Sequence, residues 1–337
     1  MRKHIAKAGK IHVLAAILLL AVIFCGALDS RTYAAEAKKY DGLKIRWATM
    51  PSQTQSVIAE ELGYFKEEFE SDGIFVELRM FPSGPPAIEA FAAGELDFAQ
   101  VGNQPTVQAI ANGINIKVIG AYQSSDGSDL GLIARNDSGI KTLEDLRGKK
   151  LGYTIGTEAH MMALKFLKSV NLNGETVQLV NLQIGDISTS IESGNIDAAV
   201  TWEPWLSTIL GNGTTHLVRD AVGFNRASSV IIGKTEFLDK YPEIVVRLLK
   251  VLDRSVKWSD EHKAESCKIL SKRNGVAESA YEAAFRTQNL ELFLDDTRIN
   301  NLADIEEFLF EQGTIRKHFN LRDYIDTSFL EKAGINK

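Results

Sequence analysis

Cysteine is scarce in this sequence, which has only Cys25 and Cys267 among 337 residues. Removal of an amino-terminal segment would leave Cys267 alone, so a framework of internal disulfides is excluded. The six histidines are scattered, and the sequence contains no H-E-x-x-H motif and no Cys/His cluster. Neither a phosphate-binding G-x-x-x-x-G-K-[ST] loop nor a G-x-S-x-G nucleophile motif occurs. We therefore expect no metal site, no cofactor and no catalytic residues.

Long apolar runs are also rare, and the one at residues 13–28 is shorter than the roughly 20 residues that span a bilayer. Basic residues precede it, and the small-residue sequence A-E-A at 35–37 follows it. This pattern predicts a secretory signal peptide over residues 1–37 and therefore a periplasmic protein. A membrane anchor is one alternative. A lipoprotein signal ending at Cys25 is another, although Phe24 stands where such signals favour a small residue.

Basic residues are not in excess over acidic ones. The formal charge is −6, and residues 1–37 contribute five basic and two acidic side chains, which leaves −9 for the rest. An acidic surface disfavours nucleic acids and anionic lipids as partners. A small anion stays compatible with this charge, because local groups decide whether it binds.

Two segments one hundred residues apart share one pattern: residues 94–99 are G-E-L-D-F-A, and residues 194–199 are G-N-I-D-A-A. In both copies we expect a helix to end at the glycine, a short strand to follow, and a new helix to begin near Pro105 or Pro204. Such internal similarity indicates two lobes of similar build. A cleft between two such lobes is a natural ligand site.

Strand and helix patterns alternate along the chain, which predicts α/β lobes with mostly parallel sheets flanked by helices. A polar segment at 124–129 and an apolar strand at 228–232 are expected to carry the two crossings between lobes. Lobe I would comprise residues 38–126 and 229–337, and lobe II residues 127–228. A single helix is predicted over 56–69, and the helical patterns between 243 and 312 are expected to pack on lobe I.

The loops that follow the carboxyl ends of parallel strands face the ligand cleft. Most of these loops lie just before a helix, whose first N–H groups and partial positive charge bind anions. Convergent helix starts could thus hold a sulfonate, phosphate, nitrate or carboxylate without Lys or Arg. The candidate ligand-binding residues are Gln53, Thr54, Ser83, Gly84, Asn103, Gln104, Thr106, Thr157, Glu158, Trp202, Glu203 and Trp205.

Several candidates also have a purely structural interpretation. The hydroxyls of Ser83, Thr106 and Thr157 could cap their own helices. Trp202 and Trp205 could be core residues rather than an apolar wall of the cleft. Each single residue is ambiguous, and the convergence of the loops favours a site.

The charged candidate residues also have two possible roles each. Glu158 and Glu203 could face water or favour their helix starts, or they could accept a ligand ammonium. His160 is more typical of an exposed or hydrogen-bonded side chain than of a ligand contact. Arg226 could pair with an anion or form a surface salt bridge.

Short elements occur in a specific order and spacing: A-x-x-x-G-Y-F at 59–65, S-G at 83–84, G-E-L-D at 94–97, L-x-D-L-x-G-K at 143–149, G-T at 156–157, G-x-x-D at 194–197 with W-x-P at 202–204, and Y-P-E at 241–243. In these elements the chain resembles the periplasmic solute-binding proteins for aliphatic sulfonates, taurine or nitrate, over about residues 42–335. The resemblance implies a two-lobed, type II periplasmic-binding-protein fold that closes on a ligand. Its cleft positions match Ser83, Gly84, Asn103, Gln104, Thr106, Thr157 and Trp202, and its first-loop contacts match Gln53 and Thr54.

The resemblance implies the extracytoplasmic solute-binding component of an ABC importer, a monomer that captures a small sulfonate and delivers it to a permease and its ATPase. Nitrate, bicarbonate or a thiamine-precursor pyrimidine are alternative ligands. A pyrimidine-synthesis-like enzyme and a secreted sensor domain are alternatives of other classes. Taurine would need an acceptor for its ammonium, and residues 226–229 offer no carboxylate. Alkanesulfonates and taurine therefore both stay open.

Overall fold

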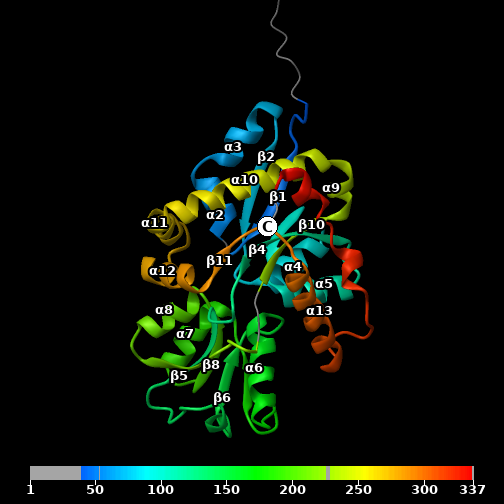
Figure 1. Cartoon of the computed structure of the whole chain (residues 1–337). Coiled ribbons are helices and arrows are strands. Elements are labelled where there is room, and N and C mark those ends of the chain that lie inside the picture. The colour runs from blue at the N-terminus through cyan, green and yellow to red at the C-terminus, as the bar shows by residue number, and fades with distance from the viewer. Residues whose placement is uncertain (1–38, 53, 225–227, 336–337) are drawn as a thin grey trace, which may run out of the picture. The chain divides into compact units, whose positions relative to one another are not determined.

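The computed structural model describes residues 39–52, 54–224 and 228–335. The described strands form two sheets, and both belong to the compact unit that begins at Gly42 (Figure 1). The six-stranded sheet has the order β11 (Asn289–Leu290), β4 (Ile116–Ser124), β10 (Ser228–Lys234), β3 (Phe98–Val101), β1 (Lys44–Thr49) and β2 (Phe75–Met80). The five-stranded sheet has the order β7 (Gln178–Asn181), β6 (Lys150–Tyr153), β8 (Ala198–Trp202), β5 (Leu130–Arg135) and β9 (Thr215–Asp220).

Both sheets are mixed, so the expectation of mostly parallel sheets is wrong in this detail. Strand β1 pairs in parallel with β2, from Lys44 opposite Phe75 to Thr49 opposite Met80, and also with β3. Strand β6 pairs in parallel with β7 and β8. Strand β10 is antiparallel to β3 and β4, and β5 is antiparallel to β8 and β9. The strands β4, β5, β9 and β10 flank the two connections between the sheets, and each has antiparallel neighbours.

The two sheets draw their strands from different parts of the chain. Strands within 44–124 and 228–290 build the six-stranded sheet, and strands within 130–220 build the five-stranded one. The division into lobe I (38–126 and 229–337) and lobe II (127–228) stays our proposal, and part of the second crossing, at 225–227, lies outside the described residues.

The repeated segments lie in corresponding places, one in each sheet. Asp97 accepts a hydrogen bond from the backbone N–H of Arg46 in β1 at 2.8 Å, and Asp197 accepts one from Lys150 in β6 at the same distance. Each aspartate therefore joins the beginning of its own strand to the parallel neighbour. The repeat fixes the amino-terminal ends of β3 and β8, and these strands then run toward the opposite edge of their sheets.

The helices between the strands are α2 (Thr54–Glu61), α3 (Tyr64–Phe69), α4 (Gly84–Ala92), α5 (Asn103–Ala111), α6 (Glu158–Ser169), α7 (Ile184–Glu192) and α8 (Trp205–Gly211). The single helix expected over 56–69 is wrong. Gly63 has a φ of 74°, a left-handed conformation that side chains disfavour, and it separates α2 from α3. Short 3₁₀ turns cover Glu70–Asp72, Glu144–Leu146 and Leu321–Tyr324.

The carboxyl-terminal helices are α9 (Thr235–Lys240), α10 (Pro242–Glu261), α11 (Lys263–Asn274), α12 (Glu278–Thr287), α13 (Asp296–Glu311) and α14 (Ser328–Ala333). Helix α10 packs against α2 and α3, α11 against α2, and α13 against α5, so these helices cover elements of the six-stranded sheet. Helix α12 also contacts α8, beside the other sheet.

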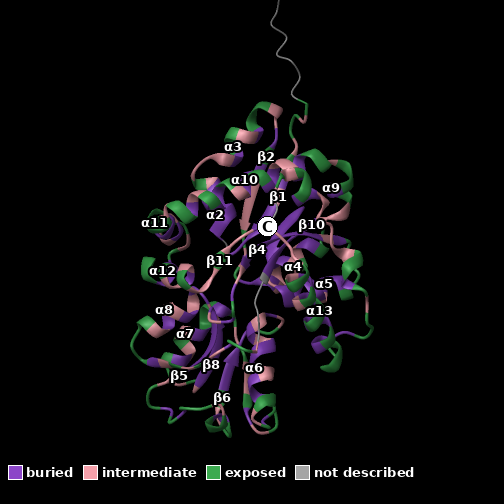
Figure 2. Ribbon diagram, in the orientation of Figure 1, coloured by how far each residue is buried: buried purple, intermediate pink, exposed green. Residues whose placement is uncertain are grey.

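The core lies along the strands, which are mostly buried in Figure 2. Trp47 of β1 is fully buried and stacks on Phe98 of β3, with ring centroids 5.2 Å apart. Cys267 is also buried, in a cluster with Val57 and Ile58 of α2. Among the described residues, none of the helices combines the length and apolar character that a membrane crossing requires.

Candidate functional site

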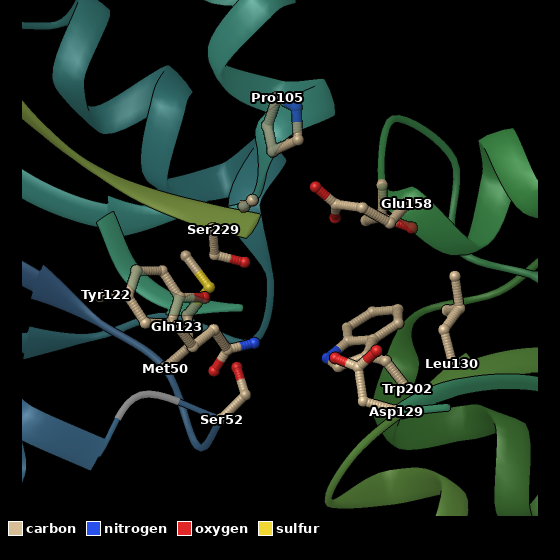
Figure 3. Close-up of a pocket in the computed structure, with 13 residues that line it drawn as sticks. Met50, Ser52, Pro105, Tyr122, Gln123, Asp129, Leu130, Glu158, Trp202 and Ser229 are labelled. Atoms are coloured by element: carbon tan, nitrogen blue, oxygen red, sulfur yellow. The ribbon is translucent and has the colours of Figure 1, made fainter. Parts of the chain in front are cut away.

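A pocket lies where loops of the two sheets meet (Figure 3). It encloses about 560 Å³, including space that is open to solvent. The six-stranded sheet and its loops contribute Met50, Ser52, Gly84, Gly102, Pro105, Tyr122, Gln123 and Ser229. The five-stranded sheet and its loops contribute Asp129, Leu130, Thr157, Glu158 and Trp202.

The pocket follows the carboxyl ends of strands, as expected for α/β sheets. Met50 and Ser52 follow β1, Gly102 follows β3, and Trp202 ends β8. Helices α4, α5 and α6 all begin beside it. The copies of the repeat thus lead into the pocket through β3 and β8, although their aspartates lie at the other end of these strands.

Helix α4 begins with Gly84, which lines the pocket. Pro85 and Pro86 carry no N–H group, so Gly84 is the one donor among the first three residues of the helix. A Cβ added to Gly84 would lie 2.6 Å from Cγ of Pro105, so α4 and α5 approach closely here. Ser83 is 2% exposed, and its Oγ has no hydrogen-bond partner and caps no N–H of α4.

The start of helix α5 is already occupied by the carboxyl group of Glu158. The backbone N–H of Gln104 donates to Oε1 of Glu158 at 3.1 Å. A Cβ on Gly102 would lie only 2.3 Å from the same oxygen, so glycine at 102 makes this approach possible. The Gln104 N–H, expected to bind ligand, is thus occupied by a side chain from across the pocket. Burial raises the pKa of the Glu158 carboxyl, while N–H donors including Gln104 oppose that rise.

The hydroxyls of Thr157 and Thr106 bond to the backbone. Thr157 Oγ1 donates to the carbonyl of Thr154 at 2.6 Å, and Thr106 Oγ1 donates to the carbonyl of Gly102 at 2.8 Å. Neither side chain caps its helix. Thr157 lines the pocket, whereas Thr106 is buried behind it.

The two tryptophans do not form a joint wall. Trp202 lines the pocket, and it packs on both cores of the five-stranded sheet. Trp205 begins α8 and packs instead on the core beside α7 and on the cluster around Cys267. It is absent from the pocket lining, so of the two tryptophans only Trp202 offers its face to a ligand.

Glu203 is buried, and its carboxylate accepts hydrogen bonds from the N–H and the hydroxyl of Ser207, at 3.2 and 2.7 Å. Burial raises the pKa of the Glu203 carboxyl to about 7. Glu203 is not among the lining residues. Its observed contacts are those of a side chain that accepts hydrogen bonds from the first turn of α8.

The remaining candidates lie apart from the pocket surface. Asn103 and Gln104 are buried in the first turn of α5, and Thr54 lines a second, smaller hollow beside Ser52 and Tyr281. His160 stacks on Tyr153, with ring centroids 5.0 Å apart, and burial lowers its pKa. Gln53 and Arg226 lie outside the described residues.

Asp129 is a pocket residue that the sequence analysis missed. It is 4% exposed, and Gln288 donates to its Oδ2 at 3.1 Å, while Oδ1 has no partner. Burial raises the pKa of its carboxyl. The polar pattern of the segment around Asp129 indicated a crossing between lobes. A single acid at the end of this polar run was the available signal for a site.

Other missed residues come from the crossing strands. Tyr122 and Gln123 belong to β4, and Ser229 belongs to β10. Side chains within strands carry no local signal of facing a ligand, in contrast to the loops that follow strands. Among the described lining residues there is no Lys, Arg or His.

This architecture is that of the periplasmic binding proteins, and solved structures share it. The periplasmic aliphatic sulphonate binding protein SsuA from Escherichia coli superposes with a TM-score of 0.75 at 19% identity, covering 84% of this chain and 92% of that one. The alkanesulfonate-binding protein SsuA from Xanthomonas axonopodis pv. citri, bound to MOPS, gives a TM-score of 0.77 at 18% identity, covering 85% and 99%. At such identities the likeness establishes the fold alone.

The chain belongs to the NMT1/THI5-like family, whose sequence pattern matches residues 50–266. It is 32% identical over 323 residues to a Bacillus subtilis (strain 168) protein whose name proposes aliphatic sulfonate binding. That alignment covers 94% of this chain and 96% of the relative. The resemblance to sulfonate-binding proteins is thereby confirmed, and the relatives support a solute-binding role.

The same fold also occurs in an enzyme. The desulfurization enzyme DSZB superposes with a TM-score of 0.69 at 16% identity, covering 86% of this chain and 98% of that one. The fold by itself therefore does not separate binding from catalysis.

Proposed function

We propose that this protein is the extracytoplasmic solute-binding component of an ABC importer and captures a small sulfonate in the pocket. One observation carries the proposal: loops and strands of two different sheets line the same pocket. A ligand there would touch both lobes, and it would stabilise the arrangement in which they meet. The partners would be a membrane permease and its ATPase, and the amino-terminal segment would direct export.

Polar groups near the pocket support a ligand with hydrogen-bonding ends. The Gly84 N–H at the start of α4, the hydroxyls of Ser52 and Ser229, and the buried Oγ of Ser83 are suited to a sulfonate's oxygens. Trp202 and Met50 offer apolar surface for a short organic chain. Such a mixture of apolar lining and few polar groups is typical of small-molecule sites.

A binding role is favoured over catalysis by the surroundings of the pocket hydroxyls. The hydroxyl of Thr157 is bound to a backbone carbonyl. The ring of His160 lies near Gln104 and Gly156 instead of a serine or threonine hydroxyl. A nucleophile activated by a neighbouring base requires such a pair.

The direct test is thermal unfolding of the mature protein with a panel of taurine, ethanesulfonate, longer alkanesulfonates, nitrate and a thiamine-precursor pyrimidine. A ligand at one hundred times its dissociation constant adds about 2.7 kcal/mol to the unfolding free energy, so we expect a rise of about 5 °C. A rise with sulfonates supports the proposal. No rise with any sulfonate, or a rise only with nitrate or the pyrimidine, would reject sulfonate capture.

A further inference from the structure

Two side chains that line the pocket each have a buried oxygen atom without a hydrogen-bond partner. Oδ1 of Asp129 and Oε1 of Gln123 are both buried and unpartnered, in side chains that are only 4% and 6% exposed. Both residues line the pocket, Asp129 from one sheet and Gln123 from the other (Figure 3). A carboxylate oxygen only accepts, so it needs a donor from outside the protein. Around Asp129 and Gln123 the pocket is therefore short of donors.

A second carboxyl group lies at the same place. Glu158 lines the pocket with Asp129, and the charge of Asp129 adds to the causes that raise the pKa of the Glu158 carboxyl. None of the described lining residues carries a positive charge. A buried carboxylate without a donor is costly, because desolvation is not compensated.

The carboxyl groups of Glu158 and Asp129 differ in the hydrogen-bond donors that the protein supplies to them. Glu158 accepts a hydrogen bond from the N–H of Gln104 at the start of α5. Asp129 receives a bond from Gln288 on Oδ2, and the Ser125 side chain and the Asp129 backbone also lower its pKa, but Oδ1 has no partner. The missing donor is thus located at Asp129, and a plain alkanesulfonate has no N–H group to supply it.

We propose that the pocket selects sulfonates that carry a protonated amine, whose N–H groups donate to Asp129 and Gln123. This inference rests on the proposed function, since the sulfonate end would use Gly84 and the nearby hydroxyls. Glu158 contributes negative charge from the start of α5 without direct contact. Asp129 is then the residue that separates aminosulfonates from alkanesulfonates.

The test is calorimetric titration of the unmodified protein with three ligands of similar size: taurine, isethionate and ethanesulfonate. Taurine and isethionate carry an amine and a hydroxyl at the end of the same two-carbon sulfonate, and ethanesulfonate lacks this terminal group. We expect taurine to bind about tenfold or more tighter than ethanesulfonate, since a hydrogen bond to a charged group is worth that much. Isethionate should lie between them.

Variants locate the selectivity. Asp129→Asn should weaken taurine about tenfold and change ethanesulfonate affinity little. Glu158→Gln keeps an acceptor for the Gln104 N–H but removes the charge, so it should weaken taurine selectively by a smaller factor. Asp137→Asn is the control, because Asp137 is exposed, pairs with Arg135 at 2.8 Å and also carries one negative charge. It should leave all three affinities unchanged.

The outcomes separate the two proposals. If ethanesulfonate binds as tightly as taurine to the unmodified protein, the amine inference fails and sulfonate capture stands. If Asp129→Asn does not fold, the ligand series and Glu158→Gln still decide the matter. If ethylamine binds as tightly as taurine, the sulfonate end contributes nothing and the proposed function fails. If none of the sulfonates binds, both proposals fail.

Discussion

Three acidic residues near the pocket have different partners and therefore different roles. Glu203 is held by Ser207 within its own segment. Glu158 reaches across the pocket to the start of α5, and Asp129 keeps one oxygen without a donor. Residue type alone could not rank them, because the ranking depends on which donors the fold brings to each carboxylate.

Glu203 gives a prediction about stability against pH. The folded protein holds its proton up to a pKa of about 7, whereas the unfolded chain releases it near 4.5. The folded state thus binds more protons between these values, and stability is lost as pH rises through this window. The loss from Glu203 is about 3 kcal/mol at most.

Glu203→Gln removes this titration and retains an acceptor and a donor for Ser207. We expect urea unfolding to show a smaller loss of stability between pH 5 and pH 8 in the variant than in the unmodified protein. Identical losses in the two proteins would mean that Glu203 is already ionised below pH 5.

At the scale of elements, the pocket depends on how closely helix starts approach. Sequence patterns placed α4, α5 and α6 at strand ends, and the structure puts their first residues around one space. The distances between them were not foreseen. Glycine at 84 and 102 allows one helix start to touch Pro105 and the other to receive a carboxylate.

Gly84→Ala tests this approach. The new methyl group would lie 2.6 Å from Cγ of Pro105, so the Pro105 ring or one of the two helix starts must shift. We expect a stability loss of about 1–3 kcal/mol and a several-fold weaker affinity for the tightest sulfonate of the panel, measured by urea unfolding and calorimetry.

Gly185→Ala is the matched control, since nothing lies within 4 Å of a Cβ at this position on the first turn of α7. It should be neutral or stabilising by up to about 1 kcal/mol, because alanine favours helix. Equal effects of the two substitutions would show that crowding at Pro105 is unimportant.

At the scale of the whole molecule, residues of both sheets line the pocket, although the two sheets share no strand. Bonds such as Gln104 to Glu158 and Gln288 to Asp129 connect segments far apart in the sequence. A ligand between such groups acts on both sides together.

Hydrogen exchange can measure this coupling. With the tightest-binding sulfonate at saturation, we expect slower amide exchange in the first turns of both α4 and α6, because ligand binding shifts the population toward closed states. Helix α9, which contributes no residue to the pocket, should exchange unchanged. Protection confined to the helix of one sheet would contradict binding between the two.

Much of this protein follows from local sequence. Alternating strand and helix patterns, glycine stops and the repeated G-x-x-D segment gave the α/β class, and the ordered motifs gave the family. These signals are local because helix caps, turns and apolar periodicity act over a few residues. The single helix over 56–69 and the mostly parallel sheets were wrong, since Gly63 broke the helix and the strands flanking the crossings paired antiparallel.

The site shows where local signals end. Of the candidates, Gly84, Thr157, Glu158 and Trp202 line the pocket. Tertiary structure alone brought Asp129 of one sheet and Gln123 of the other to the same pocket. It also directed the Trp205 side chain into a hydrophobic core. The helix start that was expected to bind a ligand instead binds the carboxyl group of Glu158. The physical reason is that charge, burial and hydrogen-bond satisfaction depend on neighbours that are distant in sequence, and only the folded chain decides who those neighbours are.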